Sequence, residues 1–160
     1  MNDLMLKLLA VLELEHTLYE RLCDLLRAER AALSARDVGA LERLVREKEE
    51  ISDEGRLLEE SRMFVTEAFA KQLGVSEPRP RLSRLCELLG EASPRLRAAH
   101  QRLATLLALA RELLEANSAV TVAELANVQS SLRALGATVA SDSYGRPAAS
   151  SAGRIARATA

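Results

Sequence analysis

Apolar residues recur at steps of three and four throughout residues 3–33, and no glycine or proline interrupts them. This spacing places the apolar side chains on one face of a helix, so it predicts a single amphipathic α-helix over the whole segment. One line of the stripe consists of Leu4, Leu8, Val11, Leu18, Leu22 and Leu25, and a second line consists of Met5, Leu12, Tyr19, Leu26 and Leu33. A helix of about 30 residues is roughly 45 Å long, so the chain begins with an elongated element.

A second long helix is predicted over residues 38–73, directly after a short break at residues 34–37. Asp37 is a good N-cap, because its carboxylate can accept hydrogen bonds from backbone N–H groups that lack partners in the first turn. A break this short forces two long helices into an antiparallel hairpin. The apolar stripe of the second helix consists of Leu41, Leu44, Ile51, Leu58, Val65 and Phe69.

Three residues on this second stripe, Lys48, Gly55 and Arg62, are not apolar. One interpretation is that the long basic side chains lay their stems over the seam and reach water at their ends. The other is that they fix the register of the hairpin by pairing with an acid such as Glu15. Gly55 is a local weak point in the helix.

The sequence GVSEPRP at residues 74–80 is a stop signal and a linker, because glycine ends helices and proline disfavours their continuation. A short helix is predicted over residues 80–89, and a long one over residues 94–140, starting at Ser93-Pro94. Near Asn117 to Thr121 the pattern weakens, which leaves two possibilities: one bent helix, or two helices that meet there.

Residues 1–140 are therefore predicted to form a single all-α domain: a long antiparallel hairpin plus a third long helix, in an elongated, coiled-coil-like bundle. The composition agrees, since 2% aromatic residues and few β-branched runs disfavour a sheet. Residues 141–160 consist mainly of Ser, Ala, Gly and Arg, so they are predicted to be a flexible tail.

Charge and motifs exclude several classes of function. A net charge of -1 predicts binding neither to nucleic acid nor to a charged membrane surface, and no stretch approaches the roughly 20 apolar residues of a membrane span. The first 16 residues lack the features of a signal peptide. Cys23 and Cys86 are expected to be free thiols in a reducing cytosol. His16 and His100 have no partners at metal-ligand spacing, and no catalytic or cofactor motif occurs, so we expect no enzyme activity, metal or cofactor.

Several features occur in a characteristic order along the chain. LLRAERAALSARDVGALERLVREKEEI contains a leucine-rich helix, a turn with Asp37, and a second helix with Lys48. Arg62 follows on the same helix, Asn117 lies in LLEANSAV, and Tyr144-Gly145 comes after a last leucine-rich stretch. In their order, spacing and total length these features resemble the FlgN family of bacterial flagellar secretion chaperones, over residues 4–146.

The resemblance implies a cytoplasmic chaperone without enzyme activity. It implies binding to flagellar hook-associated proteins, through the C-terminal helices of those clients, and delivery to components of the flagellar export gate. The client-binding region of the family maps to residues 117–146. The candidate partner-binding residues are Asn117, Val122, Leu125, Val128, Leu132, Leu135, Val139 and Tyr144.

The residues themselves support helix-in-groove recognition by the apolar line from Leu125 to Val139. The same line could instead pack on the N-terminal hairpin, or do each in turn. Tyr144 could be a docking anchor, because tyrosine combines apolar area with a polar tip, or it could cap the last helix against the hairpin. A rival interpretation of the whole chain is a structural coiled-coil or adaptor protein that forms a homodimer and has no secretion client.

Overall fold

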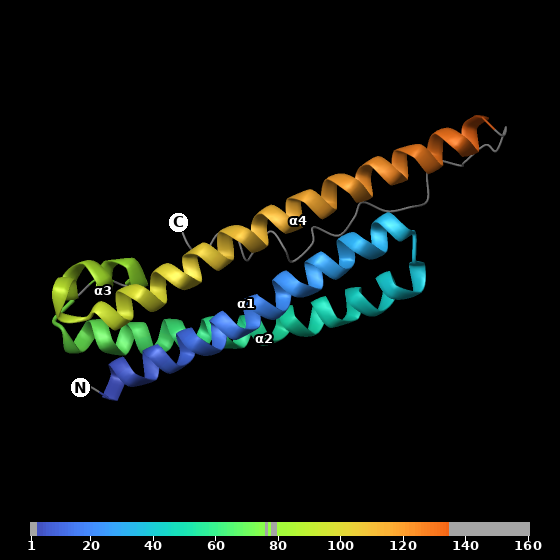
Figure 1. Ribbon diagram of the computed structural model, residues 1–160. Helices are drawn as coiled ribbons and strands as arrows, with labels where there is room; N and C mark the ends of the chain where they lie inside the picture. The colour runs from blue at the N-terminus through green and yellow to red at the C-terminus, as the bar shows by residue number, and fades with distance from the viewer. Residues whose placement is uncertain (1–2, 76, 78–79, 135–160) are drawn as a thin grey trace. The chain divides into compact units, whose positions relative to one another are not determined.

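The computed structural model describes residues 3–75, 77 and 80–134. Four α-helices and one 3-10 turn account for all the regular structure in these ranges, which confirms the predicted all-α fold class (Figure 1). They are α1 (Asp3–Ala35), α2 (Val38–Gln72), α3 (Leu82–Leu89), η1 (Gly90–Ala92) and α4 (Pro94–Ala134). The chain divides into two compact units, Met1–Val120 and Thr121–Ala160. The predicted tail at residues 141–160 lies outside the described residues.

The turn between α1 and α2 has the chemistry that the sequence predicted. The Asp37 carboxylate accepts a hydrogen bond from the Ala40 backbone N–H at 2.9 Å, which confirms Asp37 as the N-cap of α2. Arg36 has a φ of 54°, and the Asp37 N–H closes α1 by donating to the Ala32 carbonyl at 3.0 Å. Arg36 thus holds the left-handed position that glycine usually takes at a helix end. The tight turn sets α1 and α2 side by side and antiparallel (Figure 1).

Residues seven apart line the interior of the first unit, as in a coiled-coil seam. On α1 this line is Leu8, Glu15, Leu22 and Glu29; on α2 it is Phe69, Arg62, Gly55 and Lys48; on α4 it is Leu96, Leu103, Ala110 and Asn117. The members on α1 and α4 are all buried. Ion pairs join Glu15 to Arg62 and Glu29 to Lys48, so the lines of α1 and α2 run in register over two heptads.

The core has two apolar clusters along this seam. The first, around Leu8, Phe69 and Leu96, also includes Leu82 and Leu85 of α3. The second, around Leu22, Ile51 and Ala110, lies nearer the α1–α2 turn. The polar layers at Glu15 and Glu29 therefore alternate with apolar ones along the seam.

The linker and the start of α4 follow the predicted stop and start signals. Gly74, at a φ of 76°, ends α2, and the Val75 N–H donates to the Ala70 carbonyl at 3.0 Å. The short third helix begins two residues later than predicted, at Leu82, and α4 begins at Pro94.

The helix α4 is continuous through Asn117 and Thr121, which decides against two separate helices at this point. Residues 117–122 have modest helix propensity, and the difference from good helix formers is only a few tenths of a kcal/mol per residue, about 0.3–0.7. Asn117 is held by hydrogen bonds to the hairpin, and these contacts offset that cost. The predicted continuation over residues 135–140 lies outside the described residues.

Candidate partner-binding site

Asn117, the first candidate residue, lies inside the bundle, with 4% of its surface exposed. Its side-chain amide donates to the Leu26 carbonyl and to the Glu29 carboxylate, each at 2.8 Å. The other Glu29 carboxylate oxygen pairs with the Lys48 ammonium. One buried carboxylate thus joins α1, α2 and α4 in a single polar layer. Asn117 holds α4 on the hairpin, and its role as a docking contact stays a prediction.

A second contact reinforces α4 next to this layer. The Arg30 guanidinium, from α1, donates to the Ala116 backbone carbonyl at 2.7 Å. Hydrogen bonds from a charged donor contribute more than neutral ones. The position of α4 is therefore fixed by polar contacts at Ala116 and Asn117, which precede Val122, the first apolar candidate residue.

The apolar candidate residues of α4 that the structure describes are all exposed to solvent. Their exposed fractions lie between 37% and 64%, and the residues are Val122, Leu125, Val128 and Leu132. Steps of three, three and four place them along one face of the helix. Such a row has the form of a helix-in-groove recognition element. Partner binding by this row stays a prediction, and Leu135, Val139 and Tyr144 lie outside the described residues.

The Glu15–Arg62 pair is a further buried polar layer, and it confirms the register interpretation of the sequence. Arg62 Nε donates to Glu15 Oε1 at 2.9 Å, and Glu59 lies 3.6 Å from the same guanidinium. Burial raises the pKa of Glu15, and the charge of Arg62 opposes this shift. Burial also lowers the pKa of His100, and the nearby Arg62 lowers it further.

This layer contains an incompletely satisfied group. Among the described residues, the second carboxylate oxygen of Glu15 is buried without a hydrogen-bond partner. Burial raises the pKa of Tyr19, and the Glu15 charge adds to that effect. The buried Glu15 carboxylate and its Arg62 partner favour one register of the α1–α2 seam.

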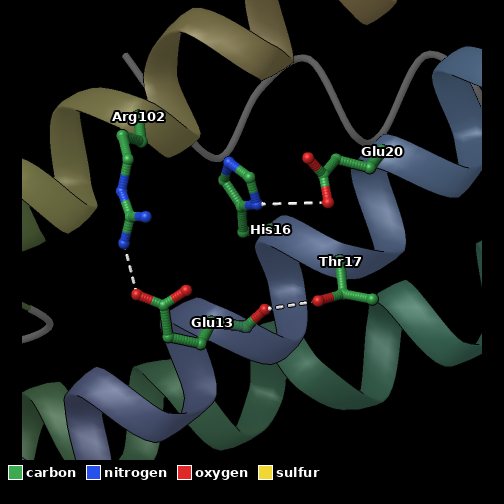
Figure 2. A network of polar contacts seen from close by, with 5 residues as sticks. All are labelled: Glu13, His16, Thr17, Glu20 and Arg102. Carbon is green, nitrogen blue, oxygen red and sulfur yellow. Dashed lines mark hydrogen bonds and ion pairs between the residues drawn. The ribbon is translucent and has the colours of Figure 1, made fainter.

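A polar network on the surface joins α1 to α4 (Figure 2). Arg102 of α4 pairs with the Glu13 carboxylate of α1, and the Thr17 hydroxyl donates to the Glu13 carbonyl at 3.1 Å. His16 lies 3.5 Å from Glu20. An open, shallow depression beside this network is lined by His16, Ala98, Gln101, Arg102, Thr105, Leu106 and Leu109. The network links α1 to α4 through the Arg102–Glu13 ion pair.

The sequence predicted pairing of Lys48 and Arg62 with an acid such as Glu15 as one of two interpretations, but it named neither Glu29 as a partner nor Asn117 as part of a polar layer. The signal was present in the spacing. Glu15 and Glu29 are fourteen residues apart on α1, as Arg62 and Lys48 are on α2. An acid and a base repeated over the same two heptads, in opposite chain directions, predict two ion pairs in an antiparallel seam.

Two other kinds of feature, a metal site and a membrane-spanning helix, do not occur among the described residues. No group of three or more His, Cys, Asp or Glu residues there is arranged to hold a metal ion. Among the described helices, none is long and apolar enough to cross a membrane. Cys23 and Cys86 are free, as expected, and burial raises the pKa of both thiols.

Comparison with known proteins adds one finding to this geometry. No curated protein and no solved structure matches the chain. The sequence model of one family, described as FlgN protein, matches residues 1–152, which is nearly the whole chain. The long antiparallel hairpin, the third helix held on it at Asn117 and this match agree, and the chain belongs to the FlgN family, a family of flagellar export chaperones.

Proposed function

We propose that this chain is a cytoplasmic export chaperone that binds flagellar hook-associated proteins and delivers them to the flagellar export gate. Membership of the FlgN family supports the chaperone role in general. The observation that carries the finer proposal is the exposed row Val122, Leu125, Val128 and Leu132, which follows the polar contacts of Asn117 on the same helix. In this proposal the row binds the C-terminal helix of the client.

The exposure and spacing of the row support this use. All four side chains are exposed, and their steps of three, three and four residues set them along one face of α4. A row of exposed apolar side chains at helical spacing is suited to a helix from another protein.

The size of the row indicates how strongly it can bind. Burying side chains that are already about half covered gains roughly 0.7–1.5 kcal/mol each, so four give roughly 3–6 kcal/mol before the entropic cost of association. This alone corresponds to dissociation constants no tighter than about tens of micromolar. A complex stable enough to escort a client therefore requires the rest of the predicted line, Leu135, Val139 and Tyr144. Weak individual anchors also suit a chaperone that must release its client.

Co-purification with the isolated C-terminal helices of the hook-associated proteins tests this proposal. The double variant Leu125→Asp/Val128→Asp should lose binding, because it puts two charges into the docking row. The matched control is Ala126→Asp/Asn127→Asp, which adds the same charges between and beside them on the same helix. Both variants should keep the thermal stability of the parent chain, because these four residues are all exposed.

A truncation after Val120 locates the site further, since it keeps the Asn117 contacts and removes the row. Binding that persists in the truncated chain would place the client site on the hairpin and refute the assignment to α4. Absence of binding by the folded full-length chain to every hook-associated helix would refute the client assignment itself.

A further inference from the structure

The outer flank of α2 carries a second regular stripe, and every member of it except the half-buried Ala68 is exposed. Its members are spaced three, four, three, four and three residues apart, and they are Glu54, Leu57, Ser61, Phe64, Ala68 and Lys71. Each lies one residue before or two residues after a member of the buried heptad line, which places the stripe about 100–160° around the helix from that line. Leu57 is 60% exposed, and Phe64, one of two phenylalanines in the chain, is 75% exposed.

The adjoining edge of α1 widens this apolar surface. Arg21 of α1 pairs with Glu54 at 3.0 Å, and this contact fixes which residues of the two helices adjoin along the outer seam. One heptad further along, in the antiparallel direction, Leu14 of α1 comes opposite Ser61 of α2. Leu14 is exposed as well. The stripe is therefore part of a two-helix surface that contains three large apolar side chains.

A soluble monomer gains nothing from an exposed phenylalanine in mid-helix, because aromatic residues are only moderate helix formers. Exposed apolar residues gathered on one face mark interaction surfaces. The 3-4 spacing of the stripe is that of a coiled-coil seam, so the fitting partner is another helix.

We propose that this stripe is the contact surface for a second copy of the chain, with the two α2 helices antiparallel about a two-fold axis between Ser61 and Phe64. In this arrangement Leu57 lies opposite the partner's Ala68, and Ser61 lies opposite the partner's Phe64. Each large side chain then meets a small one, as interdigitated packing requires. An antiparallel, isologous pairing makes every contact twice.

The charges at the two ends of the stripe complement each other in the same register. Glu54 lies opposite the partner's Lys71, and the symmetry repeats this pair at the other end. In the single chain Glu54 pairs with Arg21, and Lys71 pairs with Glu67 at 2.8 Å. These are exposed pairs of little energetic value, so they do not compete strongly with pairing across the dimer. When a second copy of the stripe runs in the opposite direction, small residues lie opposite large ones and lysine lies opposite glutamate. This match favours a second copy of the chain over an unrelated helix.

Sedimentation equilibrium of the full chain, from about 1 µM to about 1 mM, covers the range expected for a two-helix contact of modest size. We expect a monomer–dimer equilibrium. The Phe64→Glu variant should raise the dissociation constant by about 1,000-fold, because an aromatic anchor contributes about 30-fold and symmetry counts it twice. Val45→Glu is the matched control: it is the same change in charge at another exposed apolar position of α2, outside the stripe, and it should leave the equilibrium unchanged.

A charge exchange tests the register. Glu54→Lys alone and Lys71→Glu alone should each weaken the dimer, and the double variant should restore it, because the exchanged charges again lie opposite each other. A chain that stays monomeric at every concentration would overturn the proposal. The stripe would then be a contact surface for a helix of a different protein. If the Phe64→Glu variant still forms the dimer, the proposed contact surface is wrong. If the double variant does not restore the dimer, the proposed register is wrong.

Discussion

Replacing Asn117 with alanine tests whether the buried polar layer holds α4 on the hairpin. The substitution removes the hydrogen bond to the neutral Leu26 carbonyl and the one to the Glu29 carboxylate. A neutral hydrogen bond contributes about 1 kcal/mol and one to a charged group about 1.5–3 kcal/mol. Alanine has a higher helix propensity than asparagine, which adds about 0.6 kcal/mol to the free energy of unfolding. The expected net loss is therefore about 2–3 kcal/mol in the free energy of unfolding.

Urea denaturation followed by circular dichroism measures this loss at a fixed pH. Because the substitution leaves the exposed surface of the unfolded chain nearly unchanged, the slope of free energy against urea should stay constant and the midpoint should fall. Amide hydrogen exchange in α4 should accelerate more than exchange in α1, since the layer ties α4 to an intact hairpin.

Asn127→Ala is the control, because Asn127 lies on the same helix and is exposed. It should change the stability by no more than about 0.5 kcal/mol. Asn117→Asp should be worse than Asn117→Ala at neutral pH, because it places a second carboxylate against Glu29. If Asn117→Ala and Asn127→Ala prove equally stable, the layer does not hold α4 and the reasoning from these contacts is wrong.

Three further predictions concern the seam between α1 and α2. Gly55→Ala should raise stability by less than the full ~1 kcal/mol of its helix-propensity gain, because the added Cβ would lie 3.3 Å from Leu18. Gly55→Leu should cost about 1–3 kcal/mol of stability by overpacking. Thermal melts of the two variants measure this difference. Arg62→Leu should cost about 3–5 kcal/mol by leaving Glu15 buried and unpaired, whereas Arg62→Leu/Glu15→Leu should regain most of that loss; a double variant as unstable as the single one would contradict this. Folded Glu15 holds its proton more tightly than unfolded Glu15 does, so its contribution to stability grows as the pH falls. Compared with Glu15→Gln, the wild-type chain should gain stability between about pH 7 and pH 4.5, and a constant difference across that range would refute a raised pKa.

The hairpin was predictable because its determinants are local. The Asp37 cap, the apolar steps in α1 and the glycine at position 74 each act within a turn or two of the chain, and the structure agrees at all three. The continuity of the helix after Asn117 was harder to predict from the sequence. Local propensity left a break open there, whereas the structure has a continuous helix in which Asn117 bonds to Glu29, 88 residues earlier.

The sequence by itself determined the helices, the antiparallel turn and the family, since helix periodicity, caps and motif order are all written along the chain. Tertiary structure alone decided which polar residues on the helix stripes became internal partners. The sequence placed Lys48 on a helix stripe without naming its partner, and Lys48, Glu29 and Asn117 meet only when three helices adopt one register. It also separated the buried Asn117 from the exposed row that follows it, because burial depends on which faces of other helices lie within reach.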